Sequence, residues 1–301
     1  MQTPTPNDNV TPRLPLRRRW WLNLALLLLV AALALFAWHG TGTEKKDTRP
    51  VLTDVDANAV QRIELTQFNL PAVVLERHGH RWRLTAPIKA RANTFTVDSV
   101  LQLLRAPIET PVGPAEGDLA RYGLEKPSLT AKLGEATIAF GEMHPLKDLH
   151  YVRYGANVYL IASRQYAQAA RSASGFIDSR LLEEGRKPVA FKLPGFALAL
   201  KDGTWRREPE DKELSSDRVN AFVQEWRHAR ALKVGPASSQ PVKERVVITF
   251  EDDGGKRSTL SVGVTARAPE LVLVRADEGL EYRFPEETGQ RLLTLVAENP
   301  K

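Results

Sequence analysis

The feature that most constrains this chain is an internal repeat, because residues in the second half match residues in the first at a constant offset of 122 positions. Apolar side chains at spacings i, i+3, i+4 and i+7 indicate one amphipathic helix in each half, formed by Val97, Val100, Leu101 and Leu104 and then by Val219, Phe222, Val223 and Trp226. The same offset relates Val112-Gly113-Pro114 to Val234-Gly235-Pro236, Gly141 to Gly263, and Val152-Arg153 to Val274-Arg275. Agreement of several motifs at one offset indicates a tandem duplication.

Each copy shows strands, then a helix, then further strands. Asn93-Thr94 and Ser215-Ser216 precede the two helices and can cap them. His78-Gly79-His80 and Asp202-Gly203 lie between alternating apolar segments and predict β-hairpins. Period-two alternation in the later segments predicts strands with one buried face.

These patterns predict an α+β fold, with an N-terminal transmembrane helix followed by two tandem repeats. Each repeat is expected to be a mainly antiparallel sheet packed with one amphipathic helix. Trp82 recurs as Trp205 with a slip of one position, and both are expected to pack in the cores beside the helices.

A connector between the repeats is expected to be ordered. Tyr166 to Ala170 suggests a short helix, and the apolar residues between Phe176 and Leu182 would not be needed in a flexible linker. The expected organisation is a cytoplasmic tail (1–19), a transmembrane helix (20–39), a tether (40–54), a first repeat (55–162), a connector (163–188) and a second repeat (189–301).

The N-terminal segment has the pattern of a membrane anchor. Arg17-Arg18-Arg19 and Trp20-Trp21 precede an apolar run that continues to Trp38. This run approaches the ~20 helical residues needed to cross a bilayer. Cations on one side and Trp at both ends predict a single-pass bacterial inner-membrane protein with a cytoplasmic N-terminus and a periplasmic body.

A cleavable signal peptide is the alternative, with Gly40-Thr41-Gly42 as its cleavage site. The apolar run is longer than the usual core of a signal peptide, which favours an anchor. The chain has no Cys, which excludes disulfides, thiolate metal sites, Cys nucleophiles and lipid attachment through an N-terminal Cys.

Charge gives no indication of a nucleic-acid partner. The formal net charge is +6, and Arg13 and Arg17 to Arg19 against Asp8 account for half of it. The remaining excess is spread over the body, without the concentrated basic patch of a nucleic-acid-binding protein.

The chain lacks the short motifs of common enzymes. It has no Gly-rich phosphate loop, no His-Glu-x-x-His and no Gly-x-Ser-x-Gly. We therefore expect a protein that is not an enzyme, with no catalytic, cofactor-binding or metal-binding residues, no cofactor and no identifiable small-molecule ligand.

Several residues are weak candidates for a metal or ligand site, and each has a structural explanation. His78 and His80 fit an exposed turn better than a metal site, and Glu142, His144 and His150 form at most a loose loop site. Glu208, Glu210, Asp211 and Glu213 precede the second helix, where acidic residues favour the helix dipole. Glu251 to Lys256 fits a hairpin turn better than a calcium loop. Arg153 and Arg275 fit exposed strand cations better than a ligand cleft.

The motifs of the first copy resemble the domain of unknown function 4340 family. They are Trp82-Arg-Leu-Thr-Ala-Pro87, the helix from Asn93 to Leu104, the turn Tyr122-Gly123-Leu124-Glu125-Lys126-Pro127, Phe140-Gly141, and the strands Tyr151-Val152 and Val158-Tyr159-Leu160. The resemblance covers residues 60–190 well and the second copy more weakly, since that copy lacks the Tyr-Gly-Leu-x-x-Pro turn. Asn93 stands where the family usually has Asp.

The resemblance implies a membrane-anchored envelope protein with repeated domains, some members of which are associated with gliding-motility-type ABC transporter systems. It implies no catalytic residues. We therefore expect a non-catalytic accessory or scaffold of a membrane or envelope complex, such as an ABC-type transporter, with protein partners in the inner membrane or envelope. The alternative is a periplasmic ligand-binding or envelope-processing protein that uses a cleft between the repeats.

Overall fold

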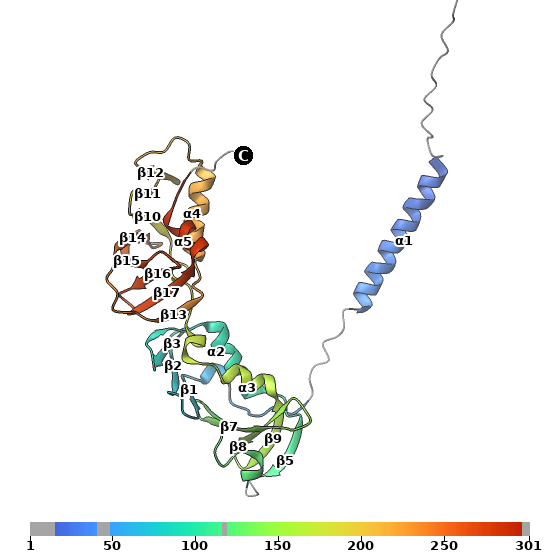
Figure 1. Cartoon of the computed structure of the whole chain (residues 1–301). Coiled ribbons are helices and arrows are strands. Elements are labelled where there is room, and N and C mark those ends of the chain that lie inside the picture. Colours follow the sequence, from blue (N-terminus) through green and yellow to red (C-terminus); the bar gives the residue numbers. More distant parts are fainter. Residues whose placement is uncertain (1–15, 41–48, 116–118, 297–301) are drawn as a thin grey trace, which may run out of the picture. The chain divides into compact units, whose positions relative to one another are not determined.

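The computed structural model describes residues 16–40, 49–115 and 119–296, and the chain divides into two compact units, Met1–Thr48 and Arg49–Lys301 (Figure 1). Residues 1–15 of the predicted tail, and residues 41–48 of the predicted tether with most of the candidate cleavage site, lie outside the described residues.

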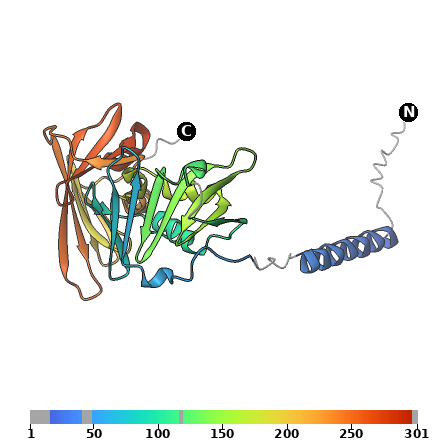
Figure 2. The ribbon, with the colours of Figure 1, turned by 90° about the horizontal axis from the view of Figure 1, so that it is seen from below.

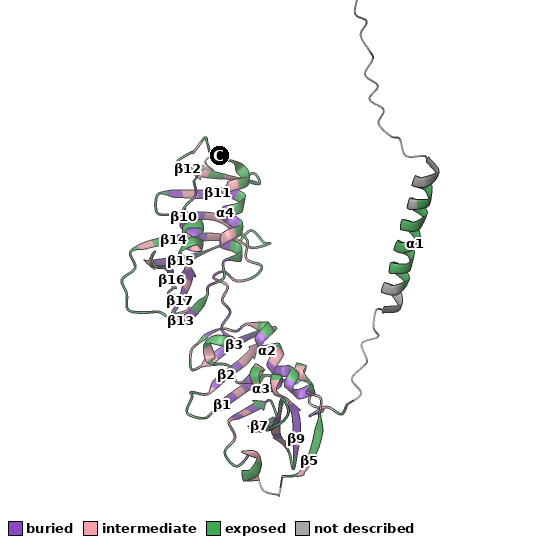
Figure 3. Ribbon diagram, turned by 45° about the vertical axis from the view of Figure 1, so that its right-hand side comes forward, coloured by how far each residue is buried: buried purple, intermediate pink, exposed green. Residues whose placement is uncertain are grey.

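Helix α1 spans Leu16–Gly40 in the N-terminal unit, so the predicted helix over residues 20–39 is present. Its described side chains, at positions 20, 21 and 23–35, are exposed (Figure 3). Within the described part of the chain, no helix is both long and apolar enough to cross a lipid bilayer.

The second unit contains two antiparallel sheets, which confirms the α+β class (Figures 1 and 2). The nine-stranded sheet has the order β4-β3-β2-β1-β6-β7-β8-β9-β5, with β1 Arg62–Gln67, β2 Val73–His78, β3 Arg81–Ala86, β4 Ala90–Arg91, β5 Thr110–Pro114, β6 Leu129–Leu133, β7 Ala136–Met143, β8 Leu149–Tyr154 and β9 Asn157–Ala162. The eight-stranded sheet has the order β12-β11-β10-β14-β15-β16-β17-β13, with β10 Pro188–Leu193, β11 Phe196–Lys201, β12 Thr204–Glu208, β13 Lys233–Pro236, β14 Glu244–Glu251, β15 Arg257–Ala266, β16 Glu270–Arg275 and β17 Leu280–Pro285.

The two sheets have the same strand order once β4 is set aside. β3-β2-β1-β6-β7-β8-β9-β5 corresponds, strand for strand, to β12-β11-β10-β14-β15-β16-β17-β13. This correspondence is what a duplicated sequence predicts. We call the nine-stranded sheet with its helices the first module and the eight-stranded sheet with its helices the second module.

The two predicted amphipathic helices are present. α2 spans Thr94–Leu101 and continues as the 3-10 helix η2 over Gln102–Arg105, and α4 spans Ser216–His228. The Asn93 side chain caps α2 by accepting from Thr96 N–H, and the Ser215 side chain caps α4 by accepting from Arg218 N–H. The apolar stripes predicted for both helices are buried.

The short helix predicted in the connector is present as α3, Ser163–Ala169, and it contacts α2, β8 and β9. A helix that was not predicted, α5, Glu286–Leu293, contacts α4, β16 and β17. Each module therefore has two helices, and the prediction of one helix per sheet is wrong. A helix about 10 Å wide covers only about two strands spaced ~4.8 Å apart, so a sheet of eight or nine strands needs more than one.

Both predicted hairpins are confirmed. β2 and β3 flank Gly79-His80, and β11 and β12 flank Asp202-Gly203. Asp202 (φ 52°) and Gly203 (φ 76°) have the two successive positive φ angles of a type I′ turn, which matches the twist of paired strands. Three shorter 3-10 helices, η1 Ala57–Ala59, η3 Leu119–Tyr122 and η4 Ala173–Phe176, complete the regular structure of the described residues.

The Tyr-Gly-Leu turn packs on the face of the first sheet opposite the helices. Gly123 has a φ of +66°, as the predicted rigid turn requires, and Leu124 is buried. A Cβ at Gly141 would lie 2.0 Å from the Tyr122 carbonyl oxygen. Glycine is therefore needed at position 141 because the turn approaches the backbone of β7 closely.

One cluster of buried apolar residues extends from Leu52 to Leu295 and includes side chains of both modules. Trp82 belongs to this core, as predicted, whereas Trp205 is half-buried and packs against its edge, 5.8 Å from the Phe191 ring. The cores of the two modules are therefore continuous.

Candidate functional site

The connector forms backbone hydrogen bonds with the first module. Asn93 N–H donates to the Phe176 carbonyl at 2.7 Å, and Asp178 N–H donates to the Arg91 carbonyl at 2.8 Å. Phe176 is completely buried. The connector is therefore bonded to the first module through its backbone.

A few residues later the connector pairs with the second module. Leu181 N–H donates to the Ala229 carbonyl at 3.0 Å, and Ala231 N–H donates to the Ser179 carbonyl at 2.9 Å. The segment from Phe176 to Leu181 thus bonds to both modules within six residues.

Buried charges from both modules and the connector meet at this place. Arg91, in β4, donates to Glu278 at 2.8 Å and to the Tyr282 hydroxyl at 3.0 Å, and both partners belong to the second module. It also pairs with Asp178 at 3.4 Å and donates to the Arg180 carbonyl at 2.6 Å, in the connector. We call Arg91, Asp178, Arg180, Arg275, Glu278 and Tyr282 the junction cluster.

The expectation that Arg275 is an exposed strand cation is wrong. Only 2% of its side chain is exposed, and it donates to the Leu181 carbonyl at 2.9 Å. It pairs with Asp277 at 2.6 Å and lies 3.3 Å from Glu278. Arg153, at the matched position of the first module, is half-buried in β8.

Burial and charge together determine the protonation of the cluster. Burial alone lowers the pKa of Arg91, but Tyr282 and Glu278 outweigh it and hold that pKa above its usual value. Burial raises the pKa of Tyr282, and the Glu278 charge adds to this effect against the opposing charge of Arg91. Arg91 is therefore a cation, and Tyr282 is a neutral phenol whose hydroxyl donates a hydrogen bond to Glu278 at 2.5 Å.

The junction cluster has the chemistry of a structural link. Asp178 pairs with Arg91 and Arg180, and Glu278 pairs with Arg91 and Arg275. Each of these carboxylates therefore contacts two guanidinium groups, and the pairs connect the first module, the connector and the second module. A hollow of 400 Å³ beside the cluster takes its lining from the first module and the connector, including Trp82 and Glu183, and none from the second module.

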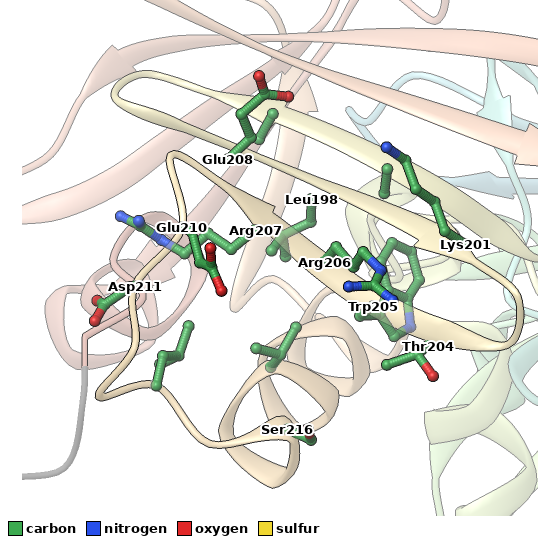
Figure 4. Close-up of a pocket in the computed structure, with 14 residues that line it drawn as sticks. Leu198, Lys201, Thr204, Trp205, Arg206, Arg207, Glu208, Glu210, Asp211 and Ser216 are labelled. Atoms are coloured by element: carbon green, nitrogen blue, oxygen red, sulfur yellow. The ribbon is translucent and has the colours of Figure 1, made fainter.

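A second hollow, of 540 Å³, lies along the outer edge of β12 (Figure 4). Trp205, Arg206 and Arg207 follow one another along the strand, and Leu214 and Ser216 close the hollow near the start of α4. We call this space, lined by residues of β11, β12, the following loop and the first turns of α4, the edge hollow.

The acidic residues predicted to precede the second helix lie around the edge hollow. Glu208, Glu210 and Asp211 line it. Asp211 also accepts from Glu213 N–H at 3.2 Å within the loop. Among the described residues, the buried Nε of Arg207 has no hydrogen-bond partner.

The histidine candidates are not brought together. His78 and His80 are exposed at the β2–β3 turn. His150 is buried, bonds Ser163 Oγ at 2.9 Å and stacks on Tyr166 with ring centroids 4.4 Å apart. The ring of His144 lies beside the ring of Tyr151. Tyr151 follows His150 in β8, so its side chain lies on the opposite face of the sheet from that of His150.

The Glu251 to Lys256 segment is a hairpin turn between β14 and β15, as predicted. One oxygen of Asp252 accepts from Gly254 N–H at 3.1 Å and from Lys256 N–H at 2.8 Å, so it is already used by the backbone. Glu142, predicted with His144 and His150 as a loose loop site, is exposed in β7. In the part of the chain that the structure describes, no group of three or more His, Asp or Glu residues is placed to hold a metal ion.

Reasoning from the sequence missed most of the junction cluster. Arg91, Asp178 and Glu278 are separated by long stretches of chain, and no spacing rule connects them. The one available signal was Asp178-Ser179-Arg180, a charged pair inside an apolar connector.

A family model described as "Domain of unknown function (DUF4340)" matches residues 82–246, more than half of the chain. The match begins later than the resemblance over 60–190 and extends into the second module. No curated protein and no solved structure matches the chain.

Proposed function

This chain belongs to the DUF4340 family, and we propose that it is a non-enzymatic scaffold or accessory subunit of a bacterial envelope complex. In this proposal α1 anchors the chain in the inner membrane, with the N-terminus in the cytoplasm and the two modules in the periplasm. An ABC-type exporter is the proposed partner, on the basis of family resemblance.

The observation that carries the proposal is the bonded and filled junction. Continuous apolar packing, the paired connector and the junction cluster all join the two modules. A body that is rigid across its modules suits a protein that holds partners at a fixed spacing. It is less suited to a protein that closes around a ligand, for which a hinge is expected.

The proposed anchor is supported by sequence. Arg17 to Arg19 precede Trp20-Trp21, and an apolar run follows to Trp38. A positive flank and interfacial Trp residues orient a span with its N-terminus inside.

Fusions to alkaline phosphatase test the orientation. A fusion after residue 45 should be active because the enzyme works only outside the cytoplasm, and a matched fusion after residue 12 should be inactive. The reverse pattern, or activity in neither fusion, contradicts the anchor.

Capture of the tagged full chain tests the partner. After crosslinking and gentle solubilisation, ABC-type exporter subunits should be recovered with the chain and not with an unrelated single-span protein carrying the same tag. Recovery of no inner-membrane protein above that control contradicts the scaffold.

The ligand-binding or envelope-processing alternative has less support. It requires a cleft that gathers polar side chains from both modules, whereas the charged groups that meet there are buried and paired with one another. The hollow nearest the junction is lined by the first module and the connector only.

A further inference from the structure

The outer edge of the first sheet is closed by the chain itself. β4 pairs with β3 through Arg83↔Arg91 and Leu84↔Ala90. Next to it, η4 contacts both β3 and α2, and its last residue, Phe176, is completely buried. The connector therefore occupies the place between the edge strand and the first helix of this module.

The equivalent edge of the second sheet is open. β12 corresponds to β3 and α4 corresponds to α2, but β12 is the terminal strand of its sheet among the described residues. The edge hollow lies between β12 and α4, where the first module holds β4 and the connector.

The backbone N–H group that precedes the first helix is also bonded differently in the two modules. In the first module, Asn93 N–H donates to Phe176 in the connector. Ser215 lies 122 positions after Asn93 and caps the equivalent helix. Among the described residues, no backbone carbonyl accepts from the N–H of Ser215, which is exposed. The place that the connector takes beside the first helix is thus open in the second module, next to a terminal strand, and an exposed strand edge is a common binding place for an added strand.

One side chain indicates the chemistry of the occupant. In the first sheet, Leu75 in β2 is paired with Leu84 in β3. At the corresponding position of the second sheet, Leu198 in β11 is paired with Arg207 in β12. Leu84 is buried, whereas Arg207 lines the edge hollow, donates one hydrogen bond to the Pro209 carbonyl at 2.5 Å and lies over the Phe196 ring at 5.1 Å. A guanidinium in this position pairs best with a carboxylate.

We propose that the edge hollow binds an extended segment of a partner polypeptide, which adds as a strand beside β12. The segment places an apolar side chain between Trp205 and α4, as Phe176 is placed in the first module, and a carboxylate on Arg207. This goes beyond the scaffold role, since it assigns the surface and the chemistry of the segment that it holds.

A peptide of residues 172–180 of this chain, Ser-Ala-Ser-Gly-Phe-Ile-Asp-Ser-Arg, is the probe, because in the first module this segment packs beside β4 and α2 and carries both an apolar group and a carboxylate. Its binding to the full chain in mild detergent is measured by fluorescence anisotropy. We expect saturable binding with one peptide per chain. Replacing Phe176 by Ala in the peptide, or Asp178 by Asn, should weaken binding about tenfold each, since a buried ring or a charge-assisted hydrogen bond is lost.

A variant of the protein isolates the carboxylate contact. In Arg207→Leu, which restores the residue type of the first module, the Asp and Asn peptides should bind equally well. The matched control Arg245→Leu removes an exposed strand cation outside the hollow and should keep the tenfold difference. Circular dichroism of both variants verifies that they are folded.

Three results overturn the proposal. They are no saturable binding to the native chain, equal binding of the Phe and Ala peptides, and a preference for Asp over Asn that survives Arg207→Leu. Binding that appears only after removal of residues 297–301 would assign the hollow to the chain's own tail instead. The test needs no membrane partner, so its failure is distinguishable from failure of the scaffold role.

Discussion

Replacing Arg91 by Met should destabilise the protein through its module junction. Arg91 is 13% exposed and pairs with Asp178 and Glu278, whose side chains are 8% and 9% exposed. Removing one partner of a buried ion pair typically costs ~3–5 kcal/mol. In this variant Asp178 still pairs with Arg180, and Glu278 still pairs with Arg275. We therefore expect the unfolding free energy to fall by about 3 kcal/mol, the lower end of that range.

Urea unfolding followed by circular dichroism measures this loss as a lower midpoint. Because the cluster joins the modules, Arg91→Met should also separate unfolding into two steps. The matched control is Arg83→Met, an exposed cation opposite Arg91 in the β3–β4 pair, which should change stability by less than about 0.5 kcal/mol. A loss under about 1 kcal/mol for Arg91→Met, or equal losses for both variants, refutes the reasoning.

Three further results are expected. Gly141→Ala should lower the unfolding midpoint, because the added Cβ would lie 2.0 Å from the Tyr122 carbonyl oxygen and displace the Tyr122-Gly123-Leu124 turn. Amide hydrogen exchange near Tyr122 should therefore rise, and unchanged exchange contradicts this prediction. Burial, against the opposing charge of Asp148, lowers the pKa of His150, so the unfolded state binds more protons and stability should fall as pH drops below about 6.5; His150→Phe should flatten that dependence in thermal melts. The raised pKa of Tyr282 keeps its proton in the folded state, so stability should fall as pH rises above about 10, and Tyr282→Phe should reduce this slope.

Local patterns were enough to predict most of the fold. The helical stripe from Val97 to Leu104, the caps at Asn93 and Ser215, and the turn at Asp202-Gly203 all depend on neighbours in sequence. Helix α5 was missed because its sequence is polar apart from Leu292 and Leu293. α5 begins 123 positions after the connector helix α3, within one position of the repeat offset, so the repeat itself indicates a helix there.

The candidate sites depend on contacts that no local pattern contains. Arg275 reads as a solvent-facing strand cation until Leu181 and Glu278 are placed beside it. Arg207 reads as an ordinary strand arginine until the hollow beside β12, which its side chain lines, is known. In both cases the sequence pattern was correct about the strand, but it did not contain the distant residues that surround the side chain.

The unequal edges of the two sheets have a consequence for stoichiometry. A duplicated fold ordinarily offers two copies of any binding place, but β4 and η4 already fill the place beside β3. Of these two places, the one beside β12 is open, so one chain would bind one copy of a partner that recognises this strand edge. Such a protein can terminate or cap an assembly, and it cannot crosslink two identical partners through this edge.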